Sequence, residues 1–155
     1  MEERNLKALI LKYNSIIKES EDIYHSASRA FGLSDCSVLI LYLINTVGQT
    51  YTQSEICTQL FIPKQTINSA LKKLELEGYL ELKLVNDKKS KQIHLTKKGT
   101  DFSATTIDKM IVAEEAAISH LTVAEQDQFL HLYSKFVKHL REEMSSVLKT
   151  TAVSI

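Results

Sequence analysis

Apolar side chains recur at every third or fourth position in three long stretches, the spacing that gathers them on one face of an α-helix. The first stretch covers residues 3–31, and Gly32 is suited to end that helix. The second covers about 97–119, with Thr96 as its cap, and the third covers about 123–148. The stripe of the third consists of Phe129, Leu132, Tyr133, Phe136, Leu140, Met144 and Val147.

Two pairs of a hydroxyl and a carboxylate, three residues apart, have the spacing of a capping box, which satisfies the first free N–H groups of a helix. Thr52 and Glu55 predict the start of a short helix over about 53–60. Thr122 and Glu125 predict the start of the last long helix.

A nearly continuous apolar run lies between the first long helix and the first capping box, from Val38 to Ile44. Ser34 is placed to cap a helix here, and Gly48 is placed to end it at about Val47. A helix that is apolar on all sides is buried. We therefore expect this helix at the centre of the fold.

The chain then continues with a helix and two strands. Pro63 breaks the short helix and is compatible with the start of another over about 64–77, which Gly78 closes. Residues 79–85 and 92–96 alternate as strands and flank a polar turn, so they predict a β-hairpin. Three helices followed by a hairpin predict a winged helix-turn-helix. The fold class is mainly α with a small β-hairpin wing, and long helices flank the core on both sides.

The composition of the 155 residues is that of an ordinary globular protein, with 44% apolar and 25% charged residues. Length favours one domain, or one small domain with appended helices. No apolar run approaches the ~18 residues of a membrane span, and the first ten residues lack the apolar region of a signal peptide. We therefore expect a cytoplasmic protein without a membrane partner.

The net charge is zero, but it is unevenly distributed. Residues 61–99 carry nine lysines against four acidic residues, whereas residues 100–155 carry five basic against eight acidic residues. One basic segment between neutral and acidic segments suits a protein that presents one face to a polyanion. The alternative is a solvated, lysine-rich surface.

The helix over 64–77 has two chemically distinct faces. Its apolar residues Ile67, Leu71 and Leu74 fall on one side, and amide, hydroxyl and ammonium groups fall on the other. Amides pair bidentately with adenine, and the first turns of a recognition helix reach the bases. We therefore expect base contacts from Gln65, Thr66, Asn68 and Ser69. The alternative is a solvated polar face.

Lysines surround this face and are suited to phosphate rather than to base contacts. On the helix these are Lys64, Lys72 and Lys73. At the tip of the hairpin they are Lys88, Lys89 and Lys91, where a cationic tip can follow a minor groove or the phosphate backbone.

The stretch KQTINSALKKLE, the closing EGYL, the wing DKK and the terminal LTKKG resemble the DNA-binding core of the MarR (multiple antibiotic resistance regulator) family. The flanking long helices extend the resemblance over nearly the whole chain. It implies a dimerisation helix over 1–31, a DNA-binding domain over 32–99 and dimerisation helices over 100–155.

The resemblance also implies a function. The protein would be a homodimeric, ligand-responsive transcriptional regulator, usually a repressor, that binds a pseudo-palindrome in double-stranded DNA. Its half-sites would lie about one turn (~34–36 Å) apart. Its effector would be a small phenolic or anionic molecule. Asp87 matches the acidic residue of the family's wing. Lys89 stands where an arginine is common, and Pro63 where many relatives have a capping Ser or Asp.

A homodimer is also favoured by the residues themselves. The stripes of the first and last helices carry more large apolar side chains than a small winged core can cover. The alternative is that these helices pack on each other within a monomer.

Two rival functions remain open from the sequence. The absence of arginine from 32–99 keeps open a protein-interaction module without DNA binding. Cys36 lies in the first turn of a predicted helix, where a thiol pKa can be lowered, which keeps open a redox sensor. Cys57 is expected in the core. Near the end of the first helix, His25 with Tyr24 and Arg29 favours either a small-anion pocket or a hydrogen-bonded helix junction.

No sequence pattern suggests an enzyme or a cofactor. The chain contains no G-x-S-x-G, no H-E-x-x-H and no P-loop, and its five histidines show no metal-ligand spacing. Catalytic residues, metal ligands and a bound cofactor are therefore not expected.

Overall fold

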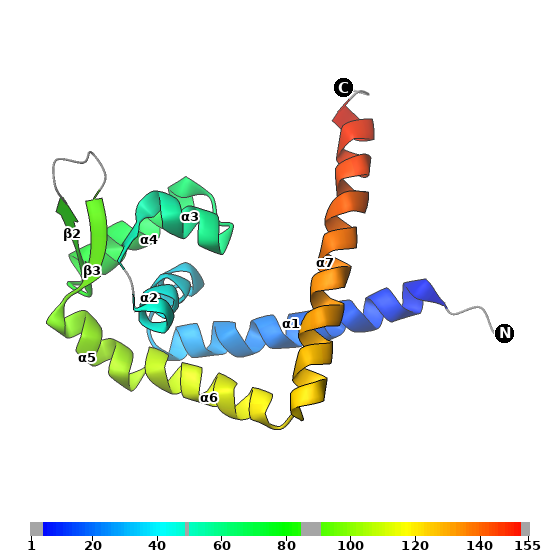
Figure 1. Ribbon diagram of the computed structural model, residues 1–155. Helices are drawn as coiled ribbons and strands as arrows, with labels where there is room; N and C mark the ends of the chain where they lie inside the picture. The colour runs from blue at the N-terminus through cyan, green and yellow to red at the C-terminus, as the bar shows by residue number, and fades with distance from the viewer. Residues whose placement is uncertain (1–4, 49, 85–90, 153–155) are drawn as a thin grey trace. The chain divides into compact units, whose positions relative to one another are not determined.

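The computed structural model describes residues 5–48, 50–84 and 91–152. The chain divides into two compact units, Met1–Ile111 and Val112–Ile155. The elements are α1 (Leu6–Ala30), α2 (Asp35–Val47), β1 (Tyr51–Thr52), α3 (Gln53–Leu60), α4 (Lys64–Leu76), β2 (Leu80–Leu84), β3 (Lys91–Leu95), α5 (Lys97–Thr105), α6 (Ile107–Ser119) and α7 (Val123–Ala152). Figure 1 labels all of them except β1.

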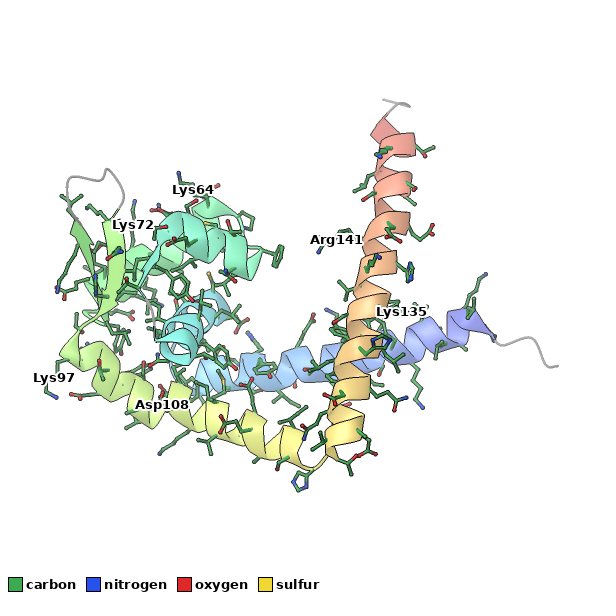
Figure 2. All side chains as sticks on the ribbon, viewed as in Figure 1. Lys64, Lys72, Lys97, Asp108, Lys135 and Arg141 are labelled. Atoms are coloured by element: carbon green, nitrogen blue, oxygen red, sulfur yellow. The ribbon has the colours of Figure 1, made fainter. Side chains whose placement is uncertain are left out.

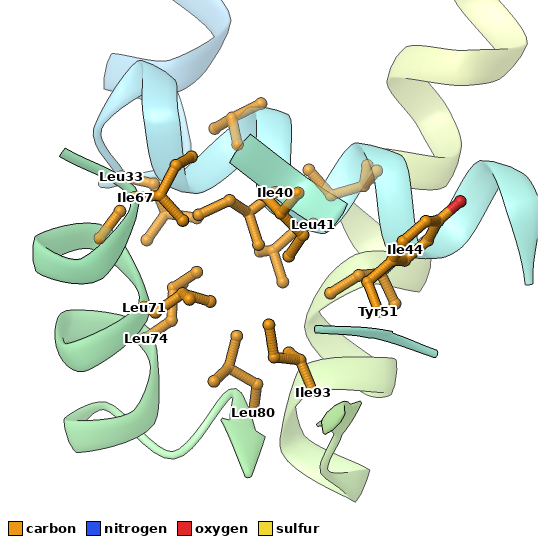
Figure 3. Packing of buried hydrophobic residues seen from close by; sticks show 14 residues of the cluster. Leu33, Ile40, Leu41, Ile44, Tyr51, Ile67, Leu71, Leu74, Leu80 and Ile93 are labelled. Atoms are coloured by element: carbon orange, nitrogen blue, oxygen red, sulfur yellow. The ribbon is translucent and has the colours of Figure 1, made fainter. Parts of the chain in front are cut away.

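The core of the first unit forms between α2 and α4. Ile40 and Leu41 of α2 are completely buried, and so are Ile67 and Leu74 of α4. Figure 3 shows these side chains converging, with those of the sheet closing the other side of the cluster. The predicted central position of α2 is confirmed. However, Leu39 is exposed, because α2 is covered on part of its surface only.

The predicted helix starts and ends are confirmed where local side chains specify them. The hydroxyl of Thr52 accepts a hydrogen bond from the backbone N–H of Glu55 (3.3 Å), and the Glu55 carboxylate accepts one from that of Thr52 (2.7 Å). Thr122 and Glu125 form the same reciprocal pair before α7. Gly48 ends α2 in the left-handed conformation (φ +62°), which only glycine adopts at little cost.

A tight turn joins α3 to α4 and completes the helix-turn-helix. Pro63 occupies the N-cap position of α4 without a side-chain capping bond, so the helix begins at Lys64. Phe61, the C-cap of α3, has φ +54° and ψ +32°. This left-handed conformation costs an L-residue about 1–2 kcal/mol.

The hairpin is present and belongs to a three-stranded antiparallel sheet in the order β1-β3-β2. Leu80 pairs with Leu95 and Leu82 with Ile93, which places apolar side chains on one face. Strand β1 is not predicted by the sequence pattern, because a strand of two residues is too short to show alternation. Its Tyr51 pairs with Ile93 and buries its ring in the core.

The expected single helix over 97–119 is wrong, since α5 and α6 are separated at Thr106 (φ −128°, ψ −74°). Three consecutive β-branched residues lie at the break, namely Thr105, Thr106 and Ile107. The hydroxyls of Thr105 and Thr106 both donate to the carbonyl oxygen of Phe102, at 2.9 and 2.7 Å. Such side-chain bonds compete with the helical backbone pattern, which explains the interruption.

The end of α1 is joined to the start of α2 by polar side chains. His25 Nδ1 on α1 lies 2.9 Å from the carboxylate of Asp35 on α2, whereas Arg29 donates to the hydroxyl of Ser26 within α1. Hydrogen bonds from His25 and Ser28 hold the pKa of the Asp35 carboxyl below its usual range. His25 therefore takes part in a helix junction, one of the two alternatives drawn from the sequence.

A second junction fixes α5 against the end of α4 and the start of β2. Lys98 Nζ donates to the carbonyl oxygen of Glu77 (2.6 Å) and lies 4.6 Å from the centroid of the Tyr79 ring. The Tyr79 ring is in turn 4.6 Å from that of Phe102. Gly99 allows this approach, because a Cβ there would lie 1.9 Å from the Tyr79 carbonyl oxygen.

Within the described residues, no single helix combines the length and apolar composition of a membrane span. Helix α1 and the residues of α2 up to Thr46 reach that length and apolar composition only when they are taken together, and they meet at a 90° bend. Buried core helices meet the same criterion, and α2 is such a helix.

We predict that Gly99→Ala lowers the free energy of unfolding by about 3 kcal/mol, because the new methyl group overlaps the Tyr79 backbone. The matched control is Lys97→Ala in the same helical turn, where the exposed ion pair with Asp101 is worth less than about 1 kcal/mol. Urea unfolding at one fixed protein concentration measures both. Equal stabilities would show that α5 does not approach Tyr79 this closely.

Candidate nucleic-acid interface

The outward face of α4 is polar and accessible. Its side chains are exposed at Lys64, Gln65, Thr66, Ser69 and Lys72, and half-buried at Asn68. This exposure follows from the helical periodicity of the sequence, because Ile67, Leu71 and Leu74 lie on the opposite side of α4 and are buried in the core. Figure 2 labels Lys64 near the start of α4 and Lys72 further along it.

The amide and hydroxyl groups of this face are largely free of other protein side chains. Gln65, Thr66 and Asn68 make no side-chain hydrogen bond to any other residue that the structure describes. The Ser69 hydroxyl donates to the carbonyl oxygen of Gln65 (3.0 Å) within the helix and keeps its lone pairs available. The face is therefore chemically competent to exchange hydrogen bonds with a ligand.

The lysines of the basic segment differ in their surroundings. Lys83 pairs with Glu81, and Lys73 lies 3.8 Å from Glu77. Lys97 and Lys98 are also engaged, by Asp101 and by the junction with α4. The lysines of this segment that have neither an ion pair nor a side-chain hydrogen bond in the described part of the chain are Lys64, Lys72 and Lys91.

The free cations lie on two elements of the winged core. Lys64 and Lys72 belong to α4, and Lys91 opens β3 opposite Leu84. The predicted residues Asp87, Lys88 and Lys89 lie outside the described residues, so their role stays a prediction. The structure thus brings the predicted helix residues together on one face and places Lys91 at the start of β3.

Phe61 was missed by sequence reasoning. It has a strongly exposed side chain and directly precedes the short turn into α4. The only sequence signal is its position between a short predicted helix and Pro63, where a glycine or asparagine would be the usual residue.

The two thiols are half-buried and pack against the core. Burial raises the pKa of the Cys36 thiol, and the nearby Cys57 raises it further. This direction is opposite to the lowering that a helix N-terminus can cause, so it does not favour the alternative of a redox sensor based on Cys36. Among the described residues, no three His, Cys, Asp or Glu side chains form a group that could hold a metal ion.

The fold and the outward face of α4 define a winged helix-turn-helix protein. Residues 31–90 match the model of the MarR family. A curated relative, the uncharacterized HTH-type transcriptional regulator YwoH of Bacillus subtilis (strain 168), is 29% identical over 108 residues, which cover 70% of this chain and 78% of that protein.

Solved structures share the fold across most of the chain. A MarR family regulator from Neisseria meningitidis, NMB1585, has a TM-score of 0.74 at 17% identity and covers 93% of this chain and 99% of its own. The S. aureus MepR–DNA complex has a TM-score of 0.68 at 20% identity and covers 84% and 96%. The resemblance drawn from the sequence is confirmed: residues 31–90 match the MarR family model, and the chain has the winged-helix fold of solved proteins of that family.

We predict that Cys36 reacts slowly with a disulfide reagent at pH 7.5 in a folded Cys57→Ser variant. The pKa of this thiol is raised by burial, so the reactive thiolate is scarce at neutral pH and becomes abundant only as the pH rises through that pKa. The reference is the same variant unfolded in urea. A folded thiol that reacts faster than the unfolded one at pH 7.5 would contradict the prediction and restore the redox-sensor hypothesis.

Proposed function

We propose that this chain binds double-stranded DNA sequence-specifically and regulates transcription as a homodimer. The observation that carries the proposal is α4, whose apolar face is locked in the core while its accessible face offers amides, hydroxyls and lysines. A helix of this chemistry fits the major groove, where base edges present donors and acceptors. A DNA partner of this kind would place the protein in the cytoplasm.

The side chains of α4 divide into two roles. Gln65 and Asn68 are suited to bidentate contacts with adenine, and Thr66 and Ser69 to contacts with several base edges. Lys64 and Lys72 are suited to phosphates, because an ammonium group attracts the backbone regardless of sequence. Lys73 contributes less, since Glu77 lies close to it.

The wing extends the electrostatic contact. Lys91 is exposed at the start of β3, and Lys88 and Lys89 precede it closely in the sequence. A lysine at position 89 binds phosphate as a point charge and selects a narrow minor groove less well than an arginine. We therefore assign most of the sequence readout to α4.

The homodimer is supported by apolar side chains that the chain leaves exposed. In α7 these include Phe129, Leu140 and Met144, each about half exposed, and in α1 they include Leu6 and Ile16. On α7 they follow a helical stripe, and the opposite side carries His131 and Lys138. A second copy of the chain would cover these side chains.

A ligand-responsive repressor is the finer part of the proposal. The organohalide-sensing regulator RdhR-CbdbA1625 has been solved in a form that binds 2,4-dichlorophenol, and it is 18% identical to this chain with a TM-score of 0.65. By analogy we propose a small phenolic or anionic effector. An effector that prefers a dimer with the wrong spacing of its two α4 helices would shift the population and release DNA.

The rival function is a protein-interaction module without DNA binding. One observation favours it, namely the absence of arginine from residues 32–99, although arginine is the commonest residue in specific contacts with guanine. Measurements of DNA binding separate the two functions.

We predict that the protein prefers DNA from upstream of its own gene over scrambled DNA of the same length. Because phosphate contacts release counterions, affinity should fall steeply between ~50 and ~200 mM salt. Fluorescence anisotropy measures both effects. Equal, weak binding to both DNAs would argue against self-regulation, and the absence of any binding would favour the interaction module.

Single substitutions should separate base readout from charge. Gln65→Ala or Asn68→Ala should relax specificity at one base pair per half-site, by about 1–3 kcal/mol. Lys72→Ala should weaken binding to all DNA sequences alike. It should also lower the slope of log affinity against log salt concentration by about one for each phosphate that is no longer neutralised. Lys109→Ala, on α6, is the charge-matched control. Equal losses of the amide variants on specific and random DNA would contradict base readout by those amides.

We predict that Leu140→Asp converts the dimer into monomers, because a carboxylate then faces the apolar surface of the second copy. The control is His131→Asp, which lies nine residues away and so about 180° around the helix. Sedimentation velocity at matched concentrations gives the mass of each. A monomeric wild type would exclude the dimer. A dimer that persists in the Leu140→Asp variant would show that the interface lies elsewhere.

A further inference from the structure

Two large apolar side chains in the described residues are more than four-fifths exposed. They are Phe61, at 84%, and Leu76, at 89%. They flank the recognition helix, because Phe61 lies in the turn before α4 and Leu76 is the last residue of α4. A single exposed leucine is common on a protein surface, but Phe61 combines its exposure with an unusual backbone.

Phe61 is the only residue other than glycine that has a positive φ in the described part of the chain. Its conformation suits glycine or asparagine, and a bulky aromatic residue there is rare. The left-handed backbone disfavours phenylalanine at this position, and the exposed ring gains nothing from burial in the core. A residue that strains the backbone without packing in the fold points to an interaction outside the fold.

The place of Phe61 indicates which interaction this is. It lies three positions before Lys64, which marks the start of α4 in Figure 2. The same end of α4 carries Gln65 and Thr66, whose side chains are exposed and make no side-chain hydrogen bonds in the described structure. Phe61 therefore precedes the end of α4 that is suited to base contacts, whereas Leu76 is at the far end of a thirteen-residue helix.

We propose that Phe61 is a DNA-contacting residue that packs its ring on the apolar part of the DNA beside the first turn of α4. The inference rests on the proposed DNA-binding function. Two groups of DNA offer this chemistry, the 5-methyl group of thymine in the major groove and the C–H groups of deoxyribose. The left-handed turn holds the ring outward before binding, so little conformational freedom is lost when DNA covers it.

The test compares substitutions at the two ends of α4. Phe61→Asn and Phe61→Gly both suit the left-handed backbone, so the variants should fold and be at least as stable as the wild type. Leu76→Asn is the matched control, an equally exposed apolar residue at the far end. Each protein is titrated against a duplex that the wild type selects from a random pool, and circular dichroism confirms folding.

Both Phe61 variants should bind the selected duplex about tenfold more weakly, which corresponds to about 1.4 kcal/mol of binding free energy. Leu76→Asn should stay within about twofold of the wild type. Folded Phe61 variants that bind as well as the wild type would overturn the inference and leave the proposed function intact. A wild type that binds and selects no DNA would overturn both.

A second duplex distinguishes the two apolar partners. Replacing thymine by uracil in the half-sites removes the 5-methyl groups and keeps the sugars. If thymine is the partner, the wild type loses affinity on the uracil duplex and Phe61→Gly does not. If deoxyribose is the partner, the affinity ratio of wild type to Phe61→Gly is the same on both duplexes. Either pattern supports a contact by Phe61.

Discussion

The packing of α4 against α2 is the interaction on which the rest of the winged core depends. Ile67, Leu71 and Leu74 fill the space beside Ile40 and Leu41, and all five side chains are almost completely shielded from water. Removing one such side chain from a core typically costs about 2–5 kcal/mol, so the orientation of α4 about its own axis is strongly fixed. This orientation decides which side chains face outward, and the polar face is its direct consequence.

Sequence reasoning succeeded where a few neighbouring residues determine the structure. The reciprocal hydrogen bonds of Thr52 with Glu55 and the left-handed Gly48 are local, and their signals are legible in the sequence. The two faces of α4 were legible for the same reason, since helical periodicity alone separates Ile67 from Gln65. The hairpin was recognised from alternation, and its register then follows from the apolar face that the core buries.

Reasoning from the sequence failed where the outcome depends on a balance of forces or on distant contacts. The break at Thr106 comes from hydroxyls that compete with backbone bonds, and no single residue there forbids a helix. The pKa of Cys36 is raised by burial in the folded chain and by Cys57, which belongs to another helix. Likewise, the basic segment shows its free cations only after folding, because partners such as Glu81 and Asp101 neutralise some lysines.

The outward amides of α4, Gln65 and Asn68, make no side-chain hydrogen bond to the rest of the described fold, and the buried residues of α4 hold their backbone in place. The stability of the fold therefore depends little on the chemistry of this face, although the two are coupled in many proteins. Surface substitutions of this kind usually change stability by less than ~0.5 kcal/mol. Selection can therefore exchange these side chains one at a time, and under the proposed function the preferred DNA sequence can diverge between relatives while the fold stays equally stable.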